Sequence, residues 1–180
     1  MAISANNYSK ALFNAIHDDE TLNKVRDDFS EVMESVRNVP AFHDFISNPK
    51  ISRDERKAVV ENTFKEVEKP LFNMLRVLSD KGKMTHIESI YEDFIKLYNA
   101  HFNQAYVTVE SVYKLSGEEL DEIGKTFIKK TGLKKLLIEN EVNEDLIGGI
   151  RVFIDTKVYD ASIRGQLNTL KGQFKAHANS

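Results

Sequence analysis

Two glycine-containing stretches have residue types that could hold a phosphate group. Gly124-Lys125-Thr126 matches the end of a P-loop, in which backbone N–H groups and a lysine cradle phosphates. The full motif needs a glycine five residues earlier, where this chain has Glu119, and the tripeptide falls inside a predicted helix. Gly148-Gly149 lacks the spacing of a dinucleotide-binding loop, and a predicted strand follows it, so no helix N-terminus faces a phosphate. We interpret the tripeptide as helix surface and Gly148-Gly149 as a tight turn or a close backbone approach.

Other side chains also lack the spacing of a catalytic or metal site. The histidines show no HExxH or HxxxH spacing: they are His17, His43, His86, His101 and His177. Adjacent acids such as Asp18-Asp19 diverge on a helix, so they form no carboxylate pair. The chain has no cysteine, which excludes thiol catalysis, disulfides and cysteine-ligated metals. We therefore expect a protein with no catalytic residue, no metal and no cofactor.

Composition indicates a globular protein with a packed core. The 180 residues are 41% hydrophobic and 29% charged, and the net charge of −3 gives no electrostatic case for nucleic-acid or anionic-lipid binding. No apolar run reaches the roughly 18–20 residues that span a bilayer. The first residues lack both the basic start and the apolar stretch of a secretory signal. We expect a cytoplasmic protein.

The distribution of proline and glycine divides the chain into two domains, 1–104 and 105–180. All three prolines precede residue 105, and seven of the eight glycines follow it. Apolar spacing before the boundary predicts six helices with short loops, hence an antiparallel bundle. The helices cover approximately Ser4–Asp18, Thr21–Arg37, Ala41–Ser47, Ser52–Phe64, Pro70–Gly82 and Thr85–Asn103. We expect Thr21 to cap the second helix and Pro40 to follow its end.

After the boundary the pattern becomes that of strands. "AYVTVESVY" is β-branched and aromatic, and "SGEE" from Ser116 is a capping box for a helix that ends at Gly132. Leu133 to Val142 is a predicted strand, two further strands follow Gly149, and a closing helix covers about Ser162–Ala176. The fold class is α+β: an N-terminal six-helix bundle plus a small C-terminal α/β domain with a mixed sheet.

Two predicted helices carry more apolar surface than one core contact requires. On Thr85–Asn103, at about 100° per residue, the apolar side chains cover an arc of roughly 160°, whereas a core-facing stripe is nearer roughly 100°. On the first helix, Phe13 lies outside the stripe of Tyr8, Leu12 and Ile16. Either both helices are central and bury all of these side chains, or they border a groove that receives a partner helix.

Both ends of the chain resemble one family. "NNYSKALFNAI" resembles the YAxAL start of the delta subunit of bacterial F-type ATP synthases, which is related to the mitochondrial oligomycin-sensitivity-conferring protein. Ser9 stands where that family usually has alanine. "LIGGIRVFIDTKVYDASIRGQLNTL" resembles the family's C-terminal signature, with a small-residue pair, an apolar strand, Asp-x-Ser and a leucine-spaced helix. The resemblance covers essentially the whole chain.

The resemblance implies a non-catalytic stator connector of the peripheral stalk, on the cytoplasmic face of the bacterial plasma membrane. Its first domain would bind N-terminal helices of alpha subunits, and its second the C-termini of b subunits. The implied groove comprises Tyr8, Leu12, Phe13, Ile16, Ile87, Ile90, Tyr91, Phe94 and Leu97, while Gly148, Gly149, Asp160 and Ser162 are structural. The alternatives are a helical adaptor for another amphipathic helix, and a small nucleotide-binding module or enzyme that uses Gly124–Thr126 or Gly148-Gly149.

Overall fold

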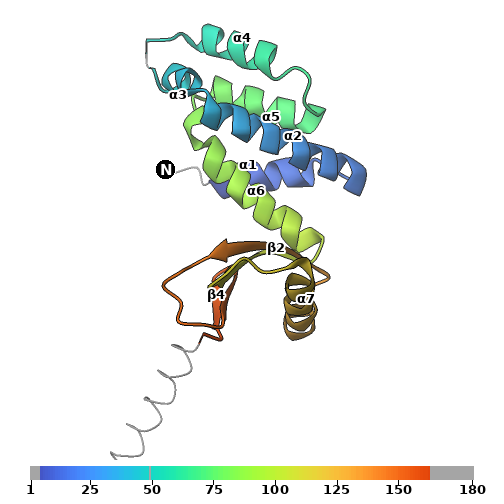
Figure 1. The fold of residues 1–180 in the computed structure, drawn as a ribbon. Helices are drawn as coiled ribbons and strands as arrows, with labels where there is room; N and C mark the ends of the chain where they lie inside the picture. Colours follow the sequence, from blue (N-terminus) through green and yellow to red (C-terminus); the bar gives the residue numbers. More distant parts are fainter. Residues whose placement is uncertain (1–4, 49, 163–180) are drawn as a thin grey trace, which may run out of the picture. The chain divides into compact units, whose positions relative to one another are not determined.

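A computed structural model describes residues 5–48 and 50–162 of the chain. In these ranges the chain forms seven α-helices, one 3-10 turn and a four-stranded sheet (Figure 1). It divides into two compact units, Met1–Asn99 and Ala100–Ser180, and this division falls a few residues before the expected boundary at 104/105. The predicted α+β class and mixed sheet are confirmed. The seventh helix, α7, lies in the second unit.

The first unit contains helices α1 to α5, the 3-10 turn η1 and most of α6. Their bounds are α1 Ala5–Asn14, α2 Asp19–Asn38, α3 Pro40–Ser47, α4 Arg53–Thr63, α5 Lys69–Asp80, η1 Met84–His86 and α6 Ile87–His101. Its core includes side chains that are less than 2% exposed, from α2, α4, α5 and α6: Val25, Phe29, Val60, Leu71, Leu75, Leu78, Ile90 and Phe94. Apolar spacing at i, i+3, i+4 and i+7 puts these side chains on one face of each helix.

The start of α2 differs from the prediction that Thr21 caps it. Asp18 is the cap, because its carboxylate accepts a hydrogen bond of 2.7 Å from the Thr21 backbone N–H. That hydrogen bond lowers the pKa of Asp18. Pro40 likewise begins α3, although it was expected only to mark the end of the preceding helix. Proline suits the first turn because the N–H that it lacks would have no partner within the helix.

Local sequence accounts for the ends of two other helices. Ser52 and Glu55 form the predicted capping box at the start of α4, and Ser116 and Glu119 form another at the start of α7. In each box the serine hydroxyl accepts the N3 backbone N–H, and the glutamate accepts the serine N–H. Helix α7 (Gly117–Thr131) ends as predicted at Gly132, whose φ of +74° is left-handed.

The second unit is a four-stranded sheet with strand order β2-β1-β3-β4. Strands β1 (Gln104–Ser111) and β2 (Lys135–Val142) are parallel, and α7 connects them. Strand β3 (Ile150–Ile154) is antiparallel to both β1 and β4 (Lys157–Asp160). The predicted closing helix, Ser162 to Ala176, lies outside the described residues from residue 163 onward.

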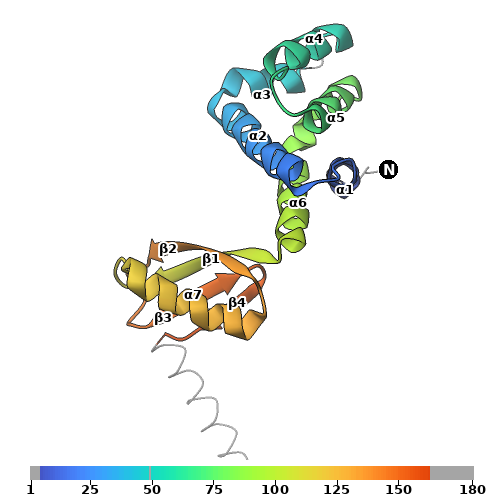
Figure 2. The same ribbon diagram turned by 90° about the vertical axis from the view of Figure 1, so that its right-hand side faces the viewer.

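Helix α7 packs on one face of this sheet, as Figure 2 shows. Every second residue of β1 points to that face, including Val107 and Val109, which are at most 1% exposed. Gly124 of α7 is also buried, and a Cβ at this position would lie 3.2 Å from Ile138 Cδ1. The interpretation of Gly124 as helix surface is therefore wrong: it permits a close contact between the helix and the sheet.

Candidate functional site

Four of the residues expected in the groove lie in the core of the first unit. Leu12 and Ile87 are 3% exposed, and Ile90 and Phe94 are fully buried. The Phe94 ring packs 5.8 Å from that of Phe29 on α2, measured between ring centroids. These four side chains are therefore covered within their own unit, and Phe94 of α6 is covered by Phe29 of α2 and Phe13 of α1. A partner groove at the expected set of residues stays a prediction.

Tyr91 also faces α2. Its ring stands edge-on to Phe29 at a centroid distance of 5.0 Å, and its hydroxyl lies 2.9 Å from the Ser30 hydroxyl. A ring packed on one side and hydrogen-bonded at its tip is held in place. Tyr91 thus takes part in the α2–α6 contact, and it is half-buried, as are the four remaining expected groove residues.

The other four expected groove residues remain partly accessible. Tyr8, Phe13 and Ile16, on α1 and just after it, and Leu97 on α6 are half-buried. The Phe13 ring lies 6.5 Å from the Phe94 ring, which joins α1 to α6. We call Tyr8, Phe13, Ile16 and Leu97 the α1/α6 surface. Its apolar side chains are only partly covered by their own unit.

The neighbouring Ser9 is buried, although the sequence resemblance marked it only as a departure from alanine. Its exposure is 0%, and its hydroxyl lies 3.1 Å from the Asn6 carbonyl oxygen and 3.3 Å from that of Ala5. A serine that bonds to its own helix backbone brings no unpaired polar group into the core. The position thus accepts serine as well as alanine.

The Gly148-Gly149 pair makes a close backbone approach. Gly149 has φ of +78°, and a Cβ there would lie 2.5 Å from the Ala161 carbonyl oxygen and 2.9 Å from Ser162 Cα. Gly148 also has a positive φ, of 147°. A side chain at Gly149 would overlap the backbone that leaves β4, so this glycine sets where the chain departs from the sheet.

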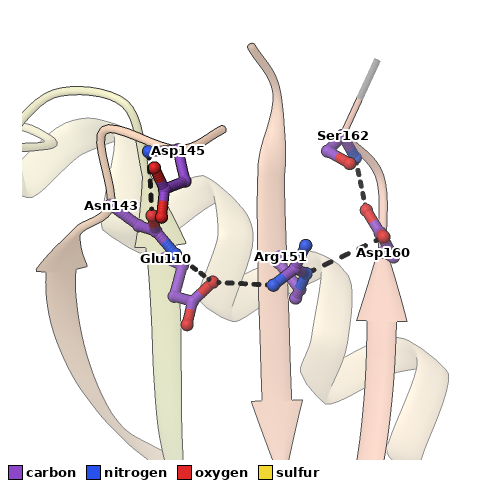
Figure 3. Close-up of polar contacts among 6 residues, drawn as sticks. All are labelled: Glu110, Asn143, Asp145, Arg151, Asp160 and Ser162. Carbon is purple, nitrogen blue, oxygen red and sulfur yellow. Dashed lines mark hydrogen bonds and ion pairs between the residues drawn. The ribbon is translucent and has the colours of Figure 1, made fainter. Parts of the chain in front are cut away.

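Polar side chains link three strands next to this glycine pair (Figure 3). Arg151 on β3 lies 3.2 Å from Glu110 on β1 and 3.7 Å from Asp160 on β4, measured between nitrogen and oxygen atoms. Asp160 also accepts the Ser162 backbone N–H at 2.9 Å. Hydrogen bonds from the Ser162 side chain and backbone lower the pKa of Asp160, and the Arg151 charge lowers it further. Asp160 and Ser162 therefore hold the end of β4 in place.

Asn140 on β2 organises the loop that follows β1, a role that no sequence motif indicated. Its amide nitrogen donates to the Val109 carbonyl and the Ser111 hydroxyl, both at 2.8 Å. Its amide oxygen accepts the Leu115 N–H at 2.8 Å. Because the partners come from separate parts of the chain, no local pattern could have identified this side chain.

Neither a metal-binding cluster nor a P-loop occurs in the described residues. Among them, no group of three or more histidine, cysteine, aspartate or glutamate side chains is placed to hold a metal ion. Gly124, Lys125 and Thr126 lie in the middle of α7, where the Thr126 hydroxyl donates to the Glu122 carbonyl. Across the same residues, no helix is both long and apolar enough to cross a bilayer.

Comparison with protein families and with other sequences gives a consistent match. Residues 5–174 match the family model described as ATP synthase delta (OSCP) subunit. ATP synthase subunit delta of Macrococcus caseolyticus is 48% identical over 174 residues, covering 97% of this chain and 98% of the relative. The subunit delta proteins of Staphylococcus carnosus and Staphylococcus aureus are 39% and 35% identical, over 97% and 95% of this chain and 98% and 96% of their own lengths.

Comparison with solved structures extends the match to the fold. A chain in the mitochondrial ATP synthase hexamer of Toxoplasma gondii superposes with a TM-score of 0.72 at 17% identity, covering 94% of this chain and 96% of that one. A chain in the Polytomella F-ATP synthase superposes with a TM-score of 0.52 at 14% identity, over 56% of this chain and 90% of that one. The similarity at this level of identity is one of fold.

Proposed function

This chain belongs to the ATP synthase delta (OSCP) subunit family, a non-catalytic part of the ATP synthase, and from that membership we propose how it makes its contacts. The first unit binds N-terminal helices of alpha subunits, and the second binds the C-termini of b subunits. The chain is thereby a stator connector on the cytoplasmic face of the bacterial plasma membrane, and it holds the catalytic head against the torque of the rotor.

The observation that carries the first contact is the α1/α6 surface. Phe13 is half-buried and Leu97 is half-buried, so each leaves apolar area that a partner helix would cover. Burying apolar area contributes roughly 25 cal/mol per Å², and a static joint needs this non-directional attraction more than precise polar chemistry. The Tyr8 ring is half-buried as well and adds to this apolar area.

The matched pair Phe13→Asp and Leu12→Asp tests this contact. The two residues are adjacent on α1, but Leu12 is 3% exposed whereas Phe13 is half-buried. We expect tagged Phe13→Asp to keep wild-type far-UV circular dichroism and to lose about tenfold or more in alpha-subunit binding, which corresponds to about 1.4 kcal/mol. We expect Leu12→Asp to unfold the first unit, because it buries a charge without a partner.

The readout is affinity purification from the host's membranes, with alpha, beta and b subunits quantified. Recovery of all three by wild type and loss of alpha with Phe13→Asp supports both contacts and their location. If Phe13→Asp recovers alpha as well as wild type does, the α1/α6 surface is not the contact. If wild type recovers a different helical protein in place of these subunits, the chain is an adaptor for another amphipathic helix.

A further inference from the structure

One face of the four-stranded sheet leaves large apolar side chains exposed. Helix α7 packs on the face that contains Val107 and Val152, each 1% exposed (Figure 2). Alternate residues of a strand point to opposite faces, so the strand pairing places Tyr106 of β1 and Val158 of β4 on the other face. Tyr106 is 54% exposed and Val158 is 55% exposed. We call this side of the sheet the exposed face.

Each strand contributes one apolar side chain to a stripe across the exposed face. Val158 on β4 pairs with Phe153 on β3, and Tyr106 on β1 pairs with Leu137 on β2. Phe153 pairs with Thr108, two residues from Tyr106, so the two aromatic side chains are diagonal neighbours. The stripe of Val158, Phe153, Tyr106 and Leu137 therefore runs diagonally from β4 to β2, and we call it the apolar stripe.

The apolar stripe has the length of about three turns of helix. Three strand gaps of about 4.8 Å and an offset of two residues at about 3.3 Å each give a diagonal of about 16 Å. A helix rises about 1.5 Å per residue, so about 11 residues span this distance. An apolar surface that is continuous from one edge of a sheet to the other is typical of an interaction site.

The flank of the stripe toward the ends of β1 and β2 is acidic. Arg151 forms ion pairs there with Glu110 and Asp160 (Figure 3), whereas Glu139 and Glu141 of β2 are exposed. The strand pairing places all five of these side chains on the exposed face. Four carboxylates and one guanidinium group give this flank a net charge of −3.

The opposite flank is weakly basic. Lys135 at the start of β2 is exposed and points to the same face as Leu137. Its partner on β1, Gln104, is uncharged. The other lysine in the four strands, Lys157, pairs with Ile154 and therefore points to the α7 face. The charge of the exposed face thus changes sign across the apolar stripe.

We propose that the exposed face binds an amphipathic helix of a partner chain, of about 11 residues or more, with an apolar stripe and one basic flank. The basic flank lies over Glu139 and Glu141, and the other flank, uncharged or acidic, lies beside Lys135. Apolar contact supplies the affinity, and the charges fix the orientation of the helix. This inference rests on the proposed function, in which the C-termini of b subunits bind the second unit, and it names the surface and the kind of helix.

Two matched pairs of variants in the full-length chain test the proposal. Tyr106→Ser removes a ring from the apolar stripe, and its control, Tyr113→Ser, removes a ring that is 60% exposed in the loop after β1. Glu139→Lys reverses a charge on the acidic flank. Its control, Glu122→Lys, makes the same change on α7, which packs on the other face of the sheet. Circular dichroism first establishes that all four variants fold.

Biolayer interferometry of the tagged chain against detergent-solubilised b subunit from the host measures the dissociation constant. We expect Tyr106→Ser to weaken b binding at least about tenfold and Tyr113→Ser less than about twofold, because buried aromatic side chains contribute most to an interface. We expect Glu139→Lys to weaken b binding about fivefold at about 50 mM salt and less at about 0.5 M, since salt screens exposed charges. Glu122→Lys should have no effect, and alpha-subunit binding should be unchanged in all four variants.

The outcomes separate this proposal from the proposed function. Wild type that binds b, with unchanged affinity in Tyr106→Ser and Glu139→Lys, overturns the proposed surface and leaves the b contact itself intact. Folded wild type that does not bind b overturns the b contact and this proposal with it. A wild-type dimer in sedimentation that Tyr106→Ser abolishes overturns the proposal and makes a second copy the occupant. A lower free energy of unfolding in Tyr106→Ser with unchanged b binding makes the occupant a segment of this chain.

Discussion

Replacing a glycine that has positive φ by alanine can lower stability in two ways: through the unfavourable backbone conformation and through overlap of the new Cβ with neighbouring atoms. Comparing Gly149→Ala with Gly132→Ala separates these two contributions. Gly132 and Gly149 both have positive φ, of +74° and +78°. A Cβ at Gly132 meets nothing within 4 Å, whereas one at Gly149 lies 2.5 Å from the Ala161 carbonyl oxygen. Gly132→Ala therefore measures the conformational cost alone, and Gly149→Ala adds an overlap with backbone that must move.

The two substitutions should lower the free energy of unfolding by clearly different amounts. A left-handed conformation costs an alanine about 1–2 kcal/mol relative to glycine. Inserting a methyl group into a packed site costs about 1–3 kcal/mol more. We expect Gly132→Ala to lower the free energy of unfolding of the second unit by about 1 kcal/mol and Gly149→Ala by about 3 kcal/mol.

Native-state hydrogen exchange is the suitable assay, because the two units need not unfold together. The slowest-exchanging amides of β1 and β3 report on the second unit, and those of α5 report on the first. The α5 amides should be unchanged in both variants. If Gly149→Ala costs no more than Gly132→Ala, the close approach at Ala161 does not constrain the end of β4.

Three further substitutions test other contacts of the second unit. Asn140→Ala should lower the free energy of unfolding by about 2–4 kcal/mol, because the Leu115 N–H and two acceptors lose their hydrogen-bond partner. Urea titration measures this loss. A loss below about 1 kcal/mol would show that water replaces the amide. Gly124→Ala should stay within about 1 kcal/mol of wild type, since the contact at 3.2 Å is with the flexible end of Ile138 and alanine favours a helix; a loss above about 2 kcal/mol would contradict this. The pKa of Asp160 is lowered by folding, so its contribution to stability is present above its unfolded pKa and is lost as the pH falls through the folded value. In Asp160→Asn the asparagine side chain still accepts the Ser162 N–H, but it does not titrate. The substitution should therefore weaken the dependence of the unfolding free energy on pH below about pH 4. An unchanged pH dependence would show that other carboxylates control the acid sensitivity.

Elements governed by neighbouring residues were predictable from the sequence. The capping boxes at Ser52 and Ser116 need only a serine and a glutamate three positions later, and both occur in the structure. The β-branched run of β1 and the Gly132 C-cap are local in the same sense. The error at α2 was also local: Asp18 and Thr21 are both good caps, and the earlier residue is the one used.

Features that depend on distant residues were not predictable. Apolar spacing predicted the broad arc of α6, but it could not separate Phe94, covered by α2 and α1, from Leu97, which stays half-buried. Tyr91 bonds to Ser30, 61 positions away. Gly124 is buried because Ile138 of a neighbouring strand lies against it.

The sequence by itself determined the α+β class, most of the helices and strands, and the family, because each rests on short-range periodicity, caps and motifs. Tertiary structure alone decided which apolar side chains remain accessible and which polar ones are joined. A surface such as Tyr8, Phe13, Ile16 and Leu97 is what remains after all other elements have packed. A cluster such as Glu110, Arg151 and Asp160 exists only once three strands are in register. Burial and register are properties of the whole packed unit, and no short stretch of the chain contains them.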